Sequence, residues 1–202
     1  MKIKYHPAAY RDCRTPLSRG FTLIELITTL AVAGILVTLA VPSFSEVIKN
    51  NRLITQENDF VTTLNLARSE AIRRSGRVTV CKSSNQTDCS GAGGWEQGWI
   101  VFNDVNNDGV VTNPTINVLR VHGALSSGVT LHGDTNLVDY VSYVSSGATQ
   151  KFAGGASATQ PGVLIMCDDR GFVSQAKGIQ ISATGRVSTD SATSTAAGSC
   201  TP

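Results

Sequence analysis

The sequence lacks the residue patterns on which most catalytic sites depend. It has no Cys-x-x-Cys motif, no phosphate-binding glycine loop and no recognisable set of nucleophile, base and orienting residue. It has only three histidines, and neither His122 nor His132 lies at zinc-ligand spacing from a cysteine or a second histidine. Both are typical of histidines at strand ends. We therefore expect a protein that is not an enzyme and that needs no cofactor.

A large excess of charge of either sign is also absent. The net charge is +2, from 17 basic and 15 acidic residues, and residues 1–20 hold five of the basic residues and one of the acidic ones. Without those residues the balance becomes 12 basic against 14 acidic, a net charge of −2. A chain with that balance has no global attraction to nucleic acid, so DNA binding would need a local basic patch.

Cysteine is scarce, but its placement is informative. Cys13 lies in the basic N-terminal stretch, and the other four, Cys81, Cys89, Cys167 and Cys200, follow a long apolar segment. An even number of cysteines beyond such a segment favours two disulfides in an oxidising periplasm, although buried reduced thiols remain an alternative.

The apolar segment covers residues 21–41 and is interrupted by one carboxylate and a few threonines. About 20 such residues span a bilayer as a helix. Because the cationic stretch precedes the segment, the positive-inside rule places residues 1–20 in the cytoplasm and the rest of the chain outside it. The sequence therefore predicts a single-pass protein of the inner membrane with a periplasmic head.

Two features of this segment are unusual. Glu25 is a carboxylate within the apolar run, where a charge costs roughly 2.5–3.5 kcal/mol, so it indicates either a function or a side chain that reaches the membrane surface. The second feature is the absence of a small-residue cleavage site after the apolar region, which a secretory signal would carry. Any cleavage must therefore precede the segment, where the basic stretch ends at Arg19 and Gly20.

Residues 19–25, Arg-Gly-Phe-Thr-Leu-Ile-Glu, resemble the prepilin motif of type IV pilins and pseudopilins. The resemblance implies that prepilin peptidase cuts between Gly20 and Phe21 and methylates the new amino group of Phe21. It also implies that Glu25 pairs with the N-terminal ammonium of a neighbouring subunit in the filament, where an unpaired carboxylate would be costly. Residues 1–20 would then be a cleaved leader, and residues 21–42 a helix used for membrane storage and for assembly.

Pro42 lies where pilins commonly carry a proline, and we expect it to break or loosen the helix because it lacks a backbone donor. Residues 43–75 should continue as an amphipathic helix, since apolar residues recur at positions 60, 64, 67 and 71. Gly76 is the expected left-handed C-cap. Four arginines near this end complement the helix dipole or form a partner-binding site: Arg68, Arg73, Arg74 and Arg77.

Residues 76–202 form short β-like runs between turn-rich stretches. Strands are expected at residues 78–81, 99–102, 116–121, 138–144, 163–167 and 179–182. Residues 147–162 and 188–198 are typical of flexible loops. The predicted fold is therefore α+β and pilin-like, a long N-terminal helix packed on an antiparallel β-sheet head.

Residues 94–104, Gly-Trp-Glu-Gln-Gly-Trp-Ile-Val-Phe-Asn-Asp, and the Asn-Asn-Asp-Gly that follows at 106–109 resemble a signature of the GspH/FimT family of minor pilins and pseudopilins. The same stretch offers a weak calcium candidate in Asp104, Asn106 and Asp108, with oxygen ligands at alternate positions. Thr115 stands where a calcium loop would have a bidentate glutamate, which favours a hairpin turn instead.

The resemblance implies a structural role as a minor pilin. Its partners would be major and minor pilins or pseudopilins, prepilin peptidase, the inner-membrane assembly platform and, before assembly, membrane lipid. It would end in the pilus or pseudopilus, near the tip. On chain proximity and the family's tendency to staple the C-terminus, we predict the disulfides Cys81–Cys89 and Cys167–Cys200.

Two alternatives remain: a type II secretion pseudopilin, and a DNA-binding minor pilin for natural transformation. Some members of the family bind DNA through a C-terminal Gly-Arg-x-Arg motif, and this chain has Gly185, Arg186 and then Ser188 in place of the second arginine. Arg186 and Lys177 are the possible DNA contacts. Two or three phosphate contacts predict weak binding that physiological salt largely removes.

Overall fold

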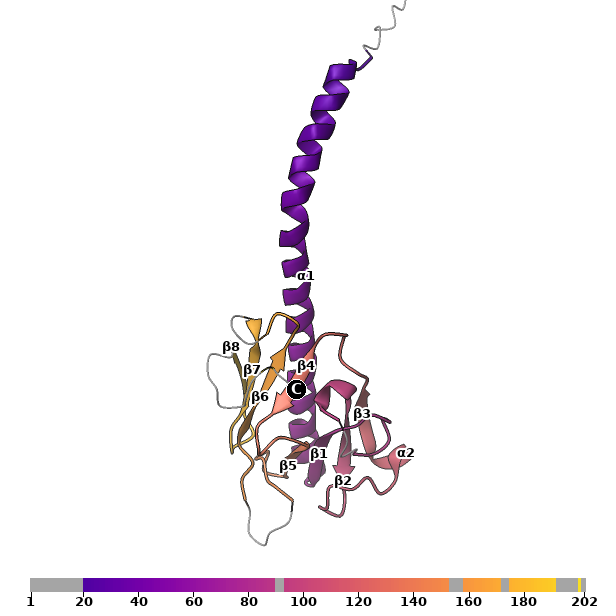
Figure 1. The fold of residues 1–202 in the computed structure, drawn as a ribbon. Helices are drawn as coiled ribbons and strands as arrows, with labels where there is room; N and C mark the ends of the chain where they lie inside the picture. The colour runs from indigo at the N-terminus through magenta and orange to yellow at the C-terminus, as the bar shows by residue number, and fades with distance from the viewer. Residues whose placement is uncertain (1–19, 90–92, 153–157, 172–174, 192–199, 201–202) are drawn as a thin grey trace, which may run out of the picture. The chain divides into compact units, whose positions relative to one another are not determined.

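The structure is a computed structural model that describes residues 20–89, 93–152, 158–171, 175–191 and Cys200. Most of the predicted leader, and parts of the two predicted flexible loops, lie outside these residues. The chain divides into two units, residues 1–44 and residues 45–202. Helix α1 (Leu23–Arg74) runs through both units (Figure 1).

The sequence suggested that Pro42 would break or loosen the helix, but the helix is not broken there. It is assigned without interruption from Leu23 to Arg74. A proline removes one backbone donor and disturbs one turn, and the turns on either side can keep their own hydrogen bonds. A local loosening of the helix near Pro42 stays a prediction.

Helix α1 ends at Arg74 in a Schellman motif, and here the expected cap is wrong by one residue. The Gly76 N–H binds the Ala71 carbonyl and the Ser75 N–H binds the Ile72 carbonyl, each at 3.2 Å. The residue with positive φ is Ser75, at 50°, rather than Gly76. The bonds at the helix end outweigh the small cost of placing a serine in this conformation, and the glycine leads directly into the first strand.

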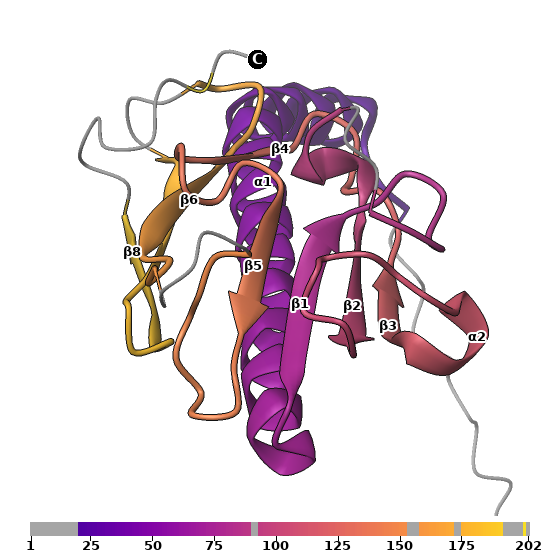
Figure 2. The same cartoon turned by 90° about the horizontal axis from the view of Figure 1, so that it is seen from below.

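The head contains two four-stranded antiparallel sheets instead of the single sheet expected. The first has the order β3-β2-β1-β5 and consists of β1 (Arg77–Lys82), β2 (Trp99–Asp104), β3 (Val118–His122) and β5 (Tyr140–Tyr143). The second has the order β4-β6-β7-β8 and consists of β4 (Thr130–Gly133), β6 (Gly162–Cys167), β7 (Lys177–Ile181) and β8 (Val187–Ser191). Figure 2 shows the two sheets next to each other against the head part of α1.

Two strands and two short helices were not predicted. Strand β4 was missed, and β8 occupies the start of the expected flexible tail. The predicted strand at 116–121 begins instead as helix α2 (Pro114–Asn117), because the Asn113 side chain accepts the Thr115 N–H and Pro114 suits a first helical turn. A short 3-10 helix, η1 (Trp95–Gln97), precedes β2.

The main core lies between α1 and both sheets. The buried helix residues Leu53, Phe60 and Leu64 face it, and Leu164 and Ile179 close it from the second sheet. The predicted apolar helix face, including Ala67 and Ala71, is fully buried. Amphipathic spacing on α1 therefore fixed how the head packs on the helix.

The outer edge of β5 is covered by a side chain rather than by a strand. Gln160 is fully buried, and its amide oxygen accepts the Ser142 N–H at 3.0 Å. Its amide nitrogen donates to the carbonyls of Tyr140 and Asn136, both at 2.9 Å. The glutamine thus satisfies backbone groups that would otherwise be orphaned at this edge.

Candidate assembly helix and head surfaces

The apolar part of α1 is exposed along its length. Every side chain with a described placement between residues 21 and 44 is exposed, among them Phe21 at 86% and Leu23 at 77%. The segment is long and apolar enough to cross a membrane. An apolar helix that its own chain leaves uncovered needs lipid or other subunits around it.

Thr22 and Glu25 form a capping box at the start of this helix. The Glu25 N–H donates to the Thr22 hydroxyl, and the Thr22 N–H donates to the Glu25 carboxylate, each at 3.3 Å. This reciprocal pair satisfies two donors that the first helical turn leaves free. The Thr-x-x-Glu spacing before an apolar run was a readable signal that the sequence analysis did not use. Gly20 and Phe21, the predicted cleavage residues, lie before this cap and are exposed.

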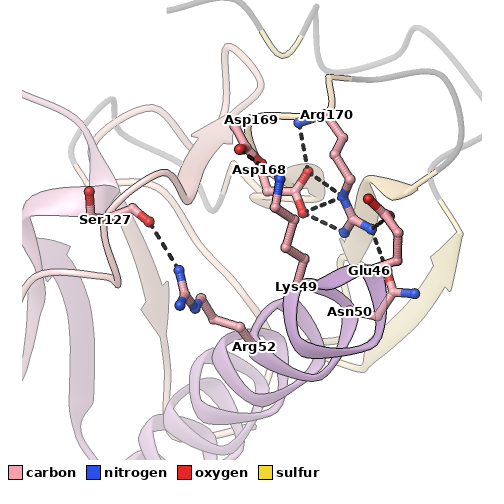
Figure 3. Close-up of polar contacts among 8 residues, drawn as sticks. All are labelled: Glu46, Lys49, Asn50, Arg52, Ser127, Asp168, Asp169 and Arg170. Carbon is pink, nitrogen blue, oxygen red and sulfur yellow. Dashed lines mark hydrogen bonds and ion pairs between the residues drawn. The ribbon is translucent and has the colours of Figure 1, made fainter. Parts of the chain in front are cut away.

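A second polar site lies where α1 meets the loop between β6 and β7 (Figure 3). The Arg170 guanidinium contacts both Asp168 oxygens, and it donates to Glu46 Oε2 at 2.7 Å and to Asn50 Oδ1 at 2.9 Å. Lys49 Nζ lies 2.9 Å from Asp169 Oδ2. These contacts attach one turn of the helix to the loop that follows Cys167. Sequence analysis missed this cluster, because its helix residues and its loop residues are 120 or more positions apart in the chain.

The half-buried pair of Asp168 and Arg170 makes the stability of the head depend on pH in the acid range. Burial by itself raises the pKa of Asp168, but the hydrogen bonds from Arg170 outweigh it and lower that pKa below its ordinary value. A carboxyl whose pKa is lowered on folding contributes stability above its unfolded pKa, about 3.9. That contribution is lost as the pH falls through the lowered folded value.

We predict that Arg170→Ala lowers the free energy of unfolding of the head by about 2 kcal/mol, because it leaves a carboxylate with a 7% exposed side chain without its guanidinium partner and with only the backbone N–H of residue 170 as a donor. Denaturant unfolding of the full chain in detergent at pH 7 and below pH 3 measures the effect. The difference should shrink at the lower pH. Lys49→Ala is the matched control, since the Lys49–Asp169 pair is exposed and should contribute less than about 1 kcal/mol. Equal losses for the two variants would contradict the prediction.

The four arginines near the end of α1 all have partners within the chain. Arg73 and Arg74 both bind Glu70, and their hydrogen bonds lower the pKa of that carboxyl to about 2. Arg68 donates to the Gly147 and Thr184 carbonyls. Arg77 is bound by Ser142, Asn107 and Gln150. The cluster therefore has a structural use, with Arg68 joining α1 to two turns of the head.

The signature at residues 94–104 has a packing explanation. Trp95 and Trp99 both meet Phe60 edge to face, with ring centroids 5.4 and 4.9 Å apart. Their indole N–H groups donate to the Leu137 carbonyl at 3.0 Å and to the Thr63 hydroxyl at 3.3 Å. Each tryptophan thus fills the core and satisfies its polar atom.

Gly98 in the same signature is required by close packing. It has a φ of 111°, and a Cβ on it would lie 2.5 Å from the His122 carbonyl oxygen. His122 itself is the last residue of β3 and stacks on Trp99, and His132 lies in β4. The expected strand-end position therefore holds for His122.

The weak calcium candidate forms a turn. The two Asp104 carboxylate oxygens accept the N–H groups of Asp108 and Gly109, each at 3.1 Å. Asp108 accepts the Val110 N–H, and the Asn106 amide donates to the Thr112 hydroxyl. Among the described residues no group of three acidic, histidine or cysteine side chains is placed to hold a metal ion.

The residues considered for DNA contact are not brought together. Arg186 follows the turn after β7, whereas Lys177 is the first residue of β7. The strand length places them roughly 15 Å apart. Gly185 is structural, since it has a φ of 77° and a Cβ on it would lie 2.0 Å from the Gly147 carbonyl oxygen. Only Arg186, which is exposed, is left for a contact.

Both disulfides link the cysteines that were expected to pair. Cys81 is bonded to Cys89 with a Cα–Cα distance of 5.5 Å, and Cys167 to Cys200 with 5.7 Å. Cys200 packs with Ile165, Ala176 and Val163 in a small separate cluster. The second bond thus holds the C-terminus against β6.

Comparison with known proteins defines the family. Residues 56–185 match the family described as Type II transport protein GspH, and residues 16–41 match the prokaryotic N-terminal methylation motif. The first match covers more than half of the chain, so the chain belongs to the GspH family. It is a pilin-like protein with a minor pilin or pseudopilin role, as the sequence predicted. The family is structural, and its members assemble with other pilin subunits.

Among solved structures, the chain is similar to the type IV minor pilin FimU of Pseudomonas aeruginosa in two crystal forms. In the first, the identity is 16% over 70% of this chain and 90% of that one, with a TM-score of 0.51. In the second, the identity is 15% over 66% and 88% of the two chains, with a TM-score of 0.45. No curated protein matches the chain. The first likeness confirms the predicted pilin-like fold.

Proposed function

We propose that this chain is a minor pilin of a type IV pilus. The observation that carries the proposal is the apolar helix, which begins at the Thr22–Glu25 capping box and whose described side chains are all exposed over residues 21–44. Before assembly the helix would lie in the inner membrane, with the leader in the cytoplasm and the head in the periplasm. Assembly near the pilus tip would replace lipid by the helices of other subunits.

The capping box gives Glu25 a defined position in that assembly. Cleavage after Gly20 would place a new ammonium group on Phe21, next to the cap residue Thr22. In the filament, the carboxylate would then pair with the ammonium of a neighbouring subunit, which removes the cost of an isolated charge in an apolar core. The Thr22 hydroxyl bonded to the Glu25 N–H would keep the helix start ordered while the carboxylate changes partners.

We predict that residues 1–20 are absent from the mature protein and that Phe21 is N-methylated. N-terminal mass analysis of the chain from membranes measures this. Gly20→Ala is the informative variant, since it alters only the residue before the predicted cut and should leave the uncleaved precursor in the membrane. Retention of residues 1–20 in the wild-type chain, or a cut after residue 41, would contradict the proposal.

A type II secretion pseudopilin would share this fold, helix and processing, so the genes next to this one distinguish the two. DNA uptake receives less support, because Lys177 and Arg186 lie at opposite ends of β7 and Ser188 replaces the second arginine of the receptor motif.

A further inference from the structure

The four edges of the two sheets differ in how they are protected against strand addition. The β5 edge is covered by Gln160, and β3 carries a bulge opposite Val101 and Phe102 together with the charged Arg120. Strand β4 is only four residues long. Strand β8 pairs with β7 in an unbroken register over five residues. Of the four, β8 is the longest strand without a bulge, and the only charge within it is Asp190.

The register shows which backbone groups of β8 are free to bond. The Ser182 N–H bonds directly to the Arg186 carbonyl, so these two residues form a hydrogen-bonded pair. Hydrogen-bonded pairs alternate along an antiparallel ladder, so Arg186 and every second residue after it direct their backbone groups toward β7. Ser188 and Asp190 therefore bond to β7. Val187 and Thr189 direct their N–H and carbonyl groups to the open edge.

A groove of about 720 Å³, lined by polar and apolar residues alike, lies across β6, β7 and β8 near the turn that follows β7. Its lining includes Val163, Gln180 and Ser188, which are neighbours across β6, β7 and β8. Arg186 also lines the groove and lies on the same face as Ser188, because side chains alternate along a strand. Its guanidinium has no hydrogen-bond or ion-pair partner among the described residues. One free cation in a groove whose other lining residues are uncharged suits a single carboxylate better than a polyphosphate.

We propose that the edge of β8 and the Arg186 groove bind an extended segment of another pilin subunit, which adds a strand to the second sheet and places a carboxylate against Arg186. The proposal rests on the proposed function, because it assumes a partner subunit in the same filament. Backbone bonds to Val187 and Thr189 would supply affinity, and the carboxylate would set the register of the added strand.

A second copy of this chain is the less suitable occupant. Antiparallel pairing of two β8 strands about Ser188 would place Arg186 opposite Asp190 of the other copy. The two-fold axis of that pairing is normal to the sheet, so it would reverse the direction of α1, which packs along the sheet. Two chains held in the same membrane need helices of the same direction.

The test compares the amount of full-length chain in sheared filaments with that in membranes, in cells that lack the native copy. Thr189→Pro removes an N–H of the open edge and keeps the bonds to β7, and Arg186→Glu reverses the charge in the groove. Each should lower the ratio about tenfold, whereas Arg186→Lys and Thr189→Val should stay within about twofold of wild type. Arg120→Glu, on the bulged edge, is the matched charge control. Protease resistance of the head in membranes checks folding.

Wild-type incorporation of Thr189→Pro or Arg186→Glu would overturn the proposal. So would loss of DNA binding by Arg186→Glu with unchanged incorporation, or disulfide-linked homodimers of a Ser188→Cys variant in membranes. A parallel Glu25→Ala arm separates the two proposals. If Glu25→Ala fails to incorporate and Thr189→Pro incorporates normally, only the docking site is refuted. If Glu25→Ala itself incorporates normally, the proposed function is refuted.

Discussion

Replacing Glu25 by alanine should leave the chain in the membrane and reduce its amount in sheared filaments at least about tenfold. The substitution makes the segment more apolar, so membrane insertion should not be impaired. Assembly should fail because the carboxylate that we propose to pair with the neighbouring ammonium is missing. Quantitative blotting of membrane and filament fractions measures both effects.

The capping box supplies the control for this experiment. Thr22→Ala removes the hydroxyl that accepts the Glu25 N–H but keeps the carboxylate. It should cost the helix start about 1 kcal/mol and leave incorporation within about twofold of wild type. Glu25→Gln keeps the size of the side chain without its charge, and should fail as alanine does. Equal incorporation of Glu25→Gln and wild type would show that a charge pair is not what assembly requires.

Replacing Gln160 by alanine should lower the free energy of unfolding of the head by about 3 kcal/mol. The substitution leaves the Ser142 N–H and the carbonyls of Tyr140 and Asn136 without their partner in a buried position. It also opens a cavity between the β5 edge and the segment that leads to β6. Denaturant unfolding of the full chain in detergent, followed by tryptophan fluorescence, measures the loss.

Two further substitutions separate hydrogen bonding from size. Gln160→Glu has nearly the same shape but removes both donors and places a carboxylate against two carbonyls, so it should be at least as destabilising as alanine at pH 7. Gln97→Ala removes an exposed glutamine and should stay within about 0.5 kcal/mol of wild type. A loss below 1 kcal/mol for Gln160→Ala would show that water or a neighbouring segment replaces the side chain.

The N-terminal part of the molecule was more predictable than the head. The apolar run, the position of Glu25 and the buried face at Phe60 and Leu64 follow from local sequence, because a helix places residues three and four apart on one face. Strand β8 escaped detection because Ser188, Thr189 and Asp190 are polar and lie at an edge, where burial does not impose an apolar pattern. Strand β4 is too short for a periodic signal.

Contacts between distant segments were the least predictable part. Neither the Arg170 cluster nor the contact of Gln160 with the β5 edge has a signature in the local sequence, since each depends on which loop the topology places beside which element. The same limit applies to Lys177 and Arg186. Their separation along the chain is small, but the strand between them extends at about 3.3 Å per residue. Proximity in sequence therefore does not place the two side chains side by side.

The bond between Cys167 and Cys200 has a consequence for the order of events during export. If the head lies in the periplasm, as proposed, Cys81, Cys89 and Cys167 would reach the oxidising compartment before Cys200 does. Cys81 and Cys89 are eight residues apart and can close at once, whereas Cys167 must wait for a partner 33 residues later. Early closure of the short loop removes two competitors for Cys167. Oxidation of the head would then be completed only after Cys200 has been translocated.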